Sequence, residues 1–489
     1  MEVPVWQPIS DLDPALRAHR DPELGSLGPV WQEQKQALGG NSAMTVFNER
    51  LARSWAVETG ILEHLYTVDR GVTNLLIEQG FDAALIPHGS TGLPPQELTD
   101  MLEAHSDALE ALFAFVARGR PLGTSFVKEL HAVLTRAQRA VLVQDEGGRR
   151  FETPLRRGEW KVLPNNPRRA DGTTYTYCPP VQVDSEMYRL IALHARLDGV
   201  AAEVRAAWLH HRFTQIHPFQ DGNGRVARAL ATLEFLKDGL LPLVVDRENR
   251  GEYIAALETA DAGDLHPLIS LFARVERSAL LRGMSLAEAT LHESASLHES
   301  ASFLAQQLRA AYLQPVAAAE RADVIAQELM AIARNKFAQA ERALAGAFER
   351  DGVAMDVGLS SSGEGNAHYF RAQIVATAKH FDYFANTRSA RRWTRLHFRG
   401  LAGDTLRADI IVSAHAVGFT PKGAMACTAF VNQRFEREDQ EAAEWQATPA
   451  CDAPFTFSHA ADVHALRQSF EAWLDRALAM AMHVLGTSL

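Results

Sequence analysis

Cysteine is scarce in this chain, with three in 489 residues. Cys178, Cys427 and Cys451 are far apart and odd in number. A disulfide framework is built from an even set, and a zinc site from ligands at short, repeated spacings. The sequence therefore argues against both.

Two further features are missing: a long apolar run and a signal-like N-terminus. No uninterrupted apolar run approaches the length of about 18 residues that suggests a membrane-spanning helix. Residues 1–14 have neither a basic start nor the apolar segment of a secretory signal. We therefore expect a cytoplasmic protein with no membrane partner, although non-classical export to a host stays open.

Positive charge is also in short supply. The chain has 49 lysines and arginines against 60 acidic residues, a net charge of −11. Nucleic-acid backbones are bound by clustered positive charge, so this balance argues against nucleic acid as a general partner. Apolar residues make up 47% of the sequence and charged residues 22%, which is ordinary for globular proteins. The length suffices for about two to four domains.

One stretch, residues 216–228, concentrates chemically useful side chains: Ile-His-Pro-Phe-Gln-Asp-Gly-Asn-Gly-Arg-Val-Ala-Arg. Helical apolar spacing runs through residues 203–216, and Pro218 disfavours helix at the residue before it. The Asp-Gly-Asn-Gly run predicts a turn, because glycine and asparagine adopt positive φ cheaply. Residues 226–236 predict a second helix. The pattern is therefore a helix, a tight loop and a helix.

This geometry suits a bound anion. The start of a helix has unpaired N–H groups and a partial positive charge, so phosphate binds there readily. Arg225 and Arg228 are three residues apart, near the same helix end, and each can fork two N–H groups onto phosphate oxygens. Asp221 is a poor neighbour for phosphate unless a cation such as Mg²⁺ lies between them. His217 can accept a proton from a hydroxyl near neutral pH.

These residues match a known signature. The run His217-Pro218-Phe219-x-Asp221-Gly222-Asn223-Gly224-Arg225-x-x-Arg228 resembles the Fic motif HPFx(D/E)GNGRxxR at every fixed position. The resemblance, over about residues 45–280, implies a helical Fic core that transfers AMP from ATP to a protein hydroxyl. It also implies roles: His217 as general base, Asp221 on Mg²⁺, Gly222 to Gly224 on the phosphates, and Arg225 and Arg228 at their β/γ end. Gly224, where related Doc phosphotransferases have lysine, favours nucleotidyl transfer.

Plainer interpretations of these residues remain. Without the family, an Asp-Gly-Asn-Gly loop between helices is usually only a connection. Phe219 is interpreted as a core anchor. His210 and His211 are interpreted as structural or exposed, because no further ligand spacing accompanies them.

A second resemblance lies nearer the N-terminus. Residues 54–60, Ser-Trp-Ala-Val-Glu-Thr-Gly, are similar to (S/T)xxxE(G/N), the inhibitory motif of one Fic class, with Thr59 at the Gly/Asn position. The resemblance implies that Glu58 pairs with Arg228 and blocks productive ATP binding, with Ser54 hydrogen-bonding nearby. The alternative is a solvated glutamate on a helix.

Helices are predicted at 41–67, 72–79, 94–117, 124–134, 183–197, 203–216, 226–236, 246–260 and 265–281. Strand-forming residues at 160–163 and 173–177 flank a turn-rich loop and predict a hairpin. The resemblance implies that this hairpin is the Fic flap, which docks the target protein by strand addition. A stabilising surface hairpin is the alternative. Tyr253 is implied as an adenine contact, with a core aromatic as its alternative.

The C-terminal part matches no family that we identify. Residues 286–350 are predicted as a helical linker, with a six-residue repeat at 291–302 and a long helix at 324–348. Residues 351–489 are predicted as a separate α+β domain with strands at 368–375, 392–398, 406–416 and 423–434, closed by a helix at 461–485. A basic cluster recognises an acidic partner or is a solvated sheet face: Arg388, Arg391, Arg392, Arg395 and Arg399.

The sequence thus predicts a mainly α chain: an N-terminal segment (1–44), a Fic domain with an N-terminal inhibitory helix (45–285), the linker and the α+β domain. The predicted function is an auto-inhibited protein adenylyltransferase that uses ATP and Mg²⁺ on a Ser, Thr or Tyr hydroxyl of a target protein. A homo-oligomer is possible. The alternatives are hydrolytic removal of AMP by the same site, and a nucleotide-sensing interaction protein.

Overall fold

The structure is a computed structural model that describes residues 6–37, 42–87, 91–144, 149–167, 174–293, 315–351, 356–363, 366–401, 406–418, 422–435 and 446–487. The chain divides into two compact units. Met1–Asp21 and Thr45–Glu276 form the helical unit, and Pro22–Met44 and Arg277–Leu489 form the sheet unit. Within the described ranges, no helix has the length and apolar character needed to cross a membrane.

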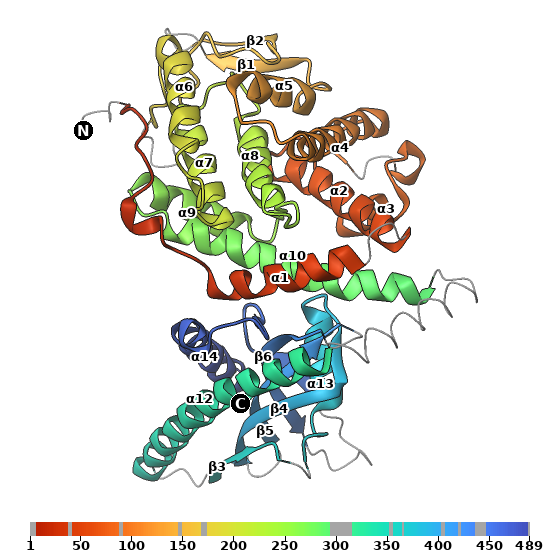
Figure 1. Cartoon of the computed structure of the whole chain (residues 1–489), viewed down its shortest axis with the longest axis vertical. Helices are drawn as coiled ribbons and strands as arrows, with labels where there is room; N and C mark the ends of the chain where they lie inside the picture. Colours follow the sequence, from red (N-terminus) through yellow and green to blue (C-terminus); the bar gives the residue numbers. More distant parts are fainter. Residues whose placement is uncertain are drawn as a thin grey trace. The chain divides into compact units, whose positions relative to one another are not determined.

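The helical unit is built around α8 (Asn223–Lys237), nearly all of whose side chains are buried. A helix that is buried all round belongs at the centre of a bundle. Figure 1 shows α7 on one side of it and α2 and α4 on the other. The surrounding helices are α2 (Ser42–Leu62), α3 (Arg70–Gln79), α4 (Pro95–Ala117), α5 (Thr124–Leu134), α6 (Val183–His194), α7 (Ala202–Ile216), α9 (Arg250–Asp261) and the first part of α10 (His266–Glu293).

The hairpin of this unit lies earlier in the chain than predicted. Strands β1 (Ala140–Gln144) and β2 (Arg150–Pro154) pair antiparallel, with Ala140 opposite Pro154. Residues 160–163, predicted as a strand, are irregular. Of the second predicted strand, 173–177, residue 173 lies outside the described residues, Thr174 forms an isolated bridge and 175–177 are irregular. The physical reason for 160–163 is visible in the hydrogen bonds of that segment. The backbone N–H groups of Lys161 and Leu163 donate to the motif loop instead of to a neighbouring strand.

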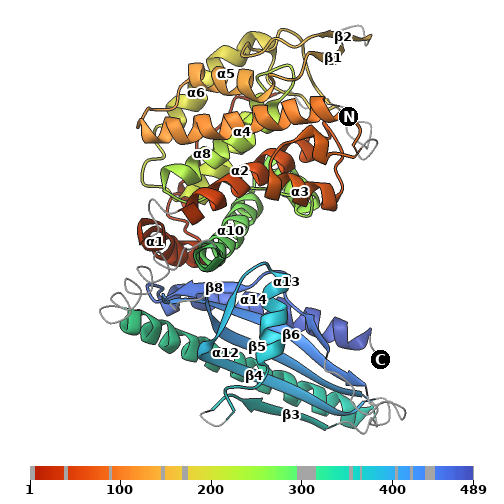
Figure 2. The same cartoon turned by 90° about the vertical axis from the view of Figure 1, so that its right-hand side faces the viewer.

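The sheet unit has an antiparallel sheet of six strands in the order β3-β4-β5-β6-β7, with β8 also paired to β6. They are β3 (Asp356–Ser361), β4 (Ala385–Leu401), β5 (Leu406–Val417), β6 (Ala424–Phe435), β7 (Gln446–Pro449) and β8 (Phe455–Ser458). The apolar face packs against α12 (Pro315–Arg350) and α14 (Val463–Gly486). Helix α13 (Arg371–His380) covers the other face (Figure 2). Helix α1 (Pro22–Ala37) also joins this unit, where Glu23 accepts the Thr456 N–H at 2.7 Å.

One predicted strand of the sheet unit is wrong. Residues 368–375 were expected to be extended, but helix α13 begins within them. Phe370 precedes the helix with a left-handed φ of 60° and packs edge-on against Trp393, at 5.1 Å between ring centroids. Ile374 and Ala378 follow at four-residue spacing and are buried. This contact with the sheet needs helical spacing, and it overrides the strand propensity of the local residues.

The predicted basic cluster is not one surface. Arg392 forms a two-pronged pair with Asp323 on α12, at 2.8 and 2.7 Å. Arg391 donates to Ala367 O at 2.7 Å, and Arg395 donates to Ser360 Oγ at 3.0 Å. These contacts make several of the arginines structural. Residues 294–302 of the predicted repeat lie outside the described residues.

Candidate active site

The motif residues form the predicted helix, loop and helix. His217 ends α7 with a left-handed φ of 51°, and its N–H donates to Phe213 O at 2.9 Å. Gly222 precedes α8 with a φ of 79°, a conformation that favours glycine. The Asn223 side chain clasps the loop from inside, because its Oδ1 accepts the Phe219 N–H and its Nδ2 donates to Phe219 O, both at 2.8 Å. Phe219 is fully buried, as its interpretation as an anchor requires.

His217 is held in a form suited to accept a proton. Its Nδ1 lies 3.3 Å from Thr214 O, and a carbonyl can only accept, so the ring hydrogen belongs on Nδ1. This leaves the Nε2 lone pair free of that bond. Burial, and then the nearby Lys161 ammonium, lower the pKa of His217 to about 3, so the imidazole is neutral near pH 7. Tyr177 stacks on the ring at 3.8 Å between centroids.

Asp221 lies at the turn with a half-exposed carboxylate. Its Oδ2 accepts from Gln138 Nε2 and its Oδ1 from the Gly222 N–H, both at 2.6 Å. Burial acts to raise the pKa of Asp221, but Arg225 and these two donors outweigh it and hold the pKa below its ordinary value. The carboxylate is therefore ionised near neutral pH.

The two motif arginines face different partners. Arg225 points to the end of α5, where it donates to Gln138 Oε1 at 2.6 Å and to Leu134 O at 3.4 Å. Arg228 is 3% exposed and points to the end of α2. There it pairs with Glu63 at 2.8 Å and donates to Thr59 O at 3.1 Å. Arg225 thus connects the motif to residues at and after the end of α5, whereas Arg228 lines the cavity described below.

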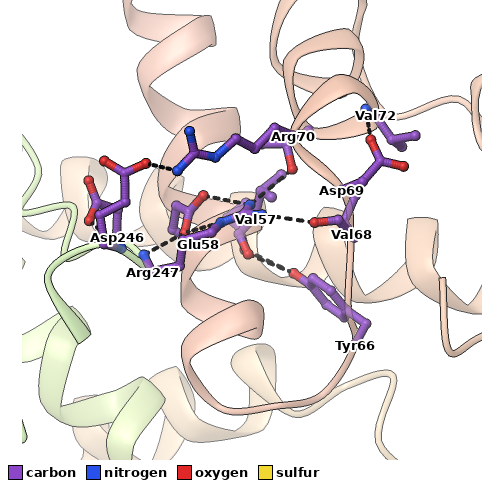
Figure 3. A network of polar contacts seen from close by, with 12 residues as sticks. Val57, Glu58, Tyr66, Val68, Asp69, Arg70, Val72, Asp246 and Arg247 are labelled. Atoms are coloured by element: carbon purple, nitrogen blue, oxygen red, sulfur yellow. Dashed lines mark hydrogen bonds and ion pairs between the residues drawn. The ribbon is translucent and has the colours of Figure 1, made fainter. Parts of the chain in front are cut away.

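The predicted pair between Glu58 and Arg228 is wrong. Glu58 instead accepts from Arg247, through the backbone N–H at 3.1 Å and through Nη2 at 2.9 Å (Figure 3). The physical reason is position. Glu58 lies within α2, is buried, and points to the segment before α9. Glu63 follows the end of α2 and lies beside Arg228. Ser54 lies one turn before Glu58 on α2 and is part-buried.

The sequence did hold a signal for Glu63. Residues 59–64, Thr-Gly-Ile-Leu-Glu-His, have the same (S/T)xxxE spacing five residues later, with His64 at the Gly/Asn position. His64 has a left-handed φ of 54°. Glycine and asparagine adopt that conformation more cheaply than other residues, which explains why the motif favours them there. Because His64 replaces the Gly or Asn of the motif, residues 59–64 do not match the full motif in the sequence.

A cavity of about 350 Å³ lies in front of these groups. Four of the predicted site residues line it: His217, Gly224, Arg228 and Tyr253. Its other lining residues include Glu63, Tyr175, Tyr177, His211, Arg250 and Asp261. The Glu63 carboxylate rests directly on the first turn of α8, because a Cβ added to Gly224 would collide with it. An anion thus already occupies the position that the helix start favours.

Comparison with known proteins assigns this part of the molecule. Residues 121–235 match the model of the Fic/DOC family. The helical unit contains a Fic/DOC domain. A 78-residue segment is 40% identical to protein adenylyltransferase fic-1 of Caenorhabditis elegans and covers 16% of this chain and 15% of that protein. A 68-residue segment is 35% identical to protein adenylyltransferase Fic of Aedes aegypti, covering 14% of each.

The chain therefore matches well under two thirds of the length of these curated relatives. Among solved structures, a signalling protein with a Fic domain from Bacteroides thetaiotaomicron is 22% identical, with a TM-score of 0.44. That alignment covers 54% of this chain and 97% of the other.

Part of the site lies outside the matched Fic residues. Glu63 comes from before them, and Tyr253 and Asp261 come from after them. Tyr253 is 7% exposed, and its hydroxyl lies 2.8 Å from His210 Nε2. Asp261 Oδ1 accepts from Tyr175 Oη at 3.0 Å and from His211 Nε2 at 3.1 Å. Sequence reasoning missed Tyr175, His211 and Asp261 as cavity residues, since they come from three distant segments with no shared motif.

Proposed function

We propose that this Fic domain transfers AMP from ATP to a hydroxyl group of a protein, and that Glu63 holds it in an inhibited state. One observation carries the proposal. A neutral imidazole, His217, and a buried guanidinium, Arg228, line the same cavity at the first turn of α8. A base for an alcohol and a site for phosphate are the two groups that nucleotidyl transfer to a hydroxyl requires.

The reaction follows from this placement. With the β- and γ-phosphates at Gly224 and Arg228, the α-phosphorus lies towards His217. The Nε2 of His217 takes the proton of a Ser, Thr or Tyr hydroxyl, and that oxygen attacks the α-phosphorus. The bond to the bridging oxygen breaks, and pyrophosphate leaves. Positioning and charge stabilisation by the helix start and Arg228 supply most of the rate.

Magnesium fits the residues present. Asp221 offers an ionised, half-exposed carboxylate near the start of α8. Within the described ranges, no group of three or more His, Cys, Asp or Glu side chains is placed to hold a metal. Mg²⁺ commonly binds to one or two carboxylates together with substrate phosphates, so a single Asp221 suffices. When bound there, the ion would neutralise charge on the leaving pyrophosphate.

Inhibition follows from competition for one guanidinium. Arg228 is bonded to Glu63 and Thr59, and a triphosphate would need the same N–H groups. We therefore assign to Glu63 the inhibitory role that the sequence predicts for Glu58. The target protein is expected to dock near Tyr177 and the segment at 160–167, and a homo-oligomer stays a prediction.

The direct test is labelling by AMP. The full chain carrying Glu63→Gly is incubated with ATP and Mg²⁺, alone and with a cell lysate, and AMP adducts are sought by mass spectrometry. His217→Ala in the same background is expected to remove them while nucleotide still binds. The matched control is His266→Ala, since His266 is exposed and outside the cavity. Adducts that persist in His217→Ala would refute the base assignment, and binding without any adduct would favour a nucleotide-sensing interaction protein.

The placement of Glu63 also supports a second candidate, hydrolytic removal of AMP. Its carboxylate lines the cavity that holds His217 and is 23% exposed, so it can orient a water molecule. Supplying an AMP-modified protein and measuring release of AMP separates the two activities. Release that requires Glu63 would favour this candidate, and transfer that rises when Glu63 is removed would favour the first.

A further inference from the structure

The backbone at His217 is strained. A φ of 51° at a residue other than glycine is costly and persists only when neighbouring structure enforces it. Much of that enforcement comes from residues 161–165, here called the brace. The brace bonds to the motif loop through Lys161 N–H to Pro218 O at 2.8 Å, Lys161 Nζ to Ile216 O at 3.4 Å, Asn165 Nδ2 to Phe219 O at 2.7 Å, and two bonds between Leu163 and Gln220 at 3.3 and 3.4 Å.

Lys161 is the centre of the brace. It is 4% exposed, which is rare for lysine. Its ammonium donates to Asn165 Oδ1 at 2.8 Å and to Ile216 O, while its own N–H holds Pro218 O. One residue therefore binds the carbonyl before His217 and the carbonyl after it. No other described residue is seen to hold both.

The Lys161 charge also acts on the His217 imidazole. Its Nζ lies 5.7 Å from the centroid of Tyr177, and the Tyr177 ring stacks on His217. After burial, the Lys161 charge is the largest cause that lowers the pKa of His217. Burial also lowers the pKa of Lys161 itself to about 7. The cost of burying this ammonium suggests a purpose beyond packing.

We propose that Lys161 is a positioning residue for the reaction: by holding the Ile216 and Pro218 carbonyls, it fixes the His217 ring in the orientation that takes the proton. The inference rests on the proposed function of His217 as base. Lysine fits this task because its protonated form has three donors and no acceptor, so it can bind several oxygens from one buried atom. The proposed nucleotide contacts are at Arg228 and Gly224, to which Lys161 makes none of its hydrogen bonds.

The test compares Lys161→Met, Lys161→Arg and Lys128→Met in the full chain with Glu63→Gly. Lys128 is the matched control, because its Nζ lies 4.4 Å from the centroid of the Trp160 ring, next to the brace, and the described contacts include no hydrogen bond from its side chain to the motif loop. Two measurements are made: hydrogen exchange of a peptide spanning residues 214–222, and AMP incorporation at varied ATP concentration. Exchange does not depend on activity.

Lys161→Met is expected to speed exchange of this peptide and to lower kcat about 10- to 100-fold, with the KM for ATP within about threefold, because misplacing a catalytic group costs rate more than binding. Lys161→Arg should restore most of the rate, and Lys128→Met should change neither measurement. If Lys161→Met does not fold, Asn165→Ala removes one brace bond to Phe219 and should give the same pattern more weakly.

Unchanged exchange and an unchanged rate in Lys161→Met would overturn the proposal. A rise in KM that matches the fall in kcat/KM would also overturn it, since the role would then be nucleotide binding. If the parent chain incorporates no AMP at all, the proposed function fails, and exchange alone still decides whether Lys161 holds the loop.

Discussion

Two glutamates near the end of α2 differ in what they hold. Glu63 faces Arg228 at the cavity, and Glu58 faces Arg247 away from it. If competition for Arg228 is the inhibitory device, only Glu63 should control it. We expect Glu63→Gly to raise AMP incorporation about 5- to 150-fold, the usual range of a regulatory coupling. Mass spectrometry of the AMP adduct at limiting ATP measures the change.

Glu58→Gly is the paired variant for this prediction. It leaves the Glu63–Arg228 contact in place, so labelling should stay near the parent level while stability falls. The opposite result, in which Glu58→Gly activates and Glu63→Gly does not, would return the inhibitory role to Glu58. Equal labelling by both variants and the parent would refute inhibition by either glutamate.

At the scale of elements, one arginine ties α2 and α3 to the segment before α9. Arg247 bonds to Glu58 on α2 and to Val68 O at 2.8 Å (Figure 3). It also donates to Thr73 Oγ1 on α3 at 2.9 Å. Removing one partner of a largely buried pair leaves the other charge without compensation. Arg247→Met should therefore lower the free energy of unfolding by about 3–5 kcal/mol.

Urea unfolding measures that loss, and faster hydrogen exchange in α3 would locate it. The control is Arg70→Met, because the Arg70–Glu248 pair is exposed on both sides. An exposed pair contributes about 0–1 kcal/mol, so this control should change stability little. Losses of equal size in the two variants would show that the Arg247 contacts are not special.

Some helices of the helical unit were predicted almost to the residue, whereas the two longest helices were predicted too short, at 324–348 for α12 and 265–281 for α10. The range 124–134 matches α5 at both ends, and 94–117 differs from α4 by one residue. Their apolar spacing is set within the segment itself, so it can be read without the fold. The strand prediction at 160–163 failed because N–H groups of this segment bond to the motif loop. The strand prediction at 368–375 failed because Phe370 packs on Trp393.

The site was predictable to the same extent. Three motif residues, His217, Gly224 and Arg228, line one cavity together with Tyr253, whereas Asp221 and Arg225 are not among its lining residues. The contact of Glu63 with Arg228 depends on how α2 meets α8. The (S/T)xxxE spacing occurs both at Ser54–Glu58 and at Thr59–Glu63, so spacing alone could not choose between the two glutamates. The same limit applies to Lys161, which is 56 residues before His217 and has no motif of its own.

At the scale of the whole molecule, the two units should respond differently to acid. The helical unit contains buried histidines whose pKa burial lowers: to about 3 for His105 and His217, to about 4 for His131, and well below the ordinary value for His210. Between these values and the ordinary value of 6.5, the unfolded chain binds protons that the folded unit does not. Stability must therefore fall as pH drops below about 6.5.

The sheet unit has opposing groups. Burial lowers the pKa of His415 to about 3, but it raises the pKa of the Asp409 carboxyl to about 6. A raised carboxyl pKa has the opposite sign, because the folded state then binds the proton first as pH falls through 6. Over the window from about pH 6 to 4 these two contributions oppose each other, although burial also lowers the pKa of His397. In the helical unit burial raises the pKa of the Glu203 carboxyl, but the four buried histidines outnumber it. Acid should therefore destabilise the helical unit more than the sheet unit.

Hydrogen exchange of the full chain at increasing urea, at pH 7 and at pH 5, tests this difference unit by unit. The free energy of unfolding of the helical unit should fall sharply at pH 5, by about 1.4 kcal/mol per pH unit for each proton gained, while that of the sheet unit changes less. His105→Gln should reduce the slope of the unfolding free energy with pH by the contribution of one proton. His266→Gln, at an exposed residue, should not alter that slope. Parallel shifts of both units, or an unchanged slope in His105→Gln, would show that buried neutral histidines do not set the acid sensitivity.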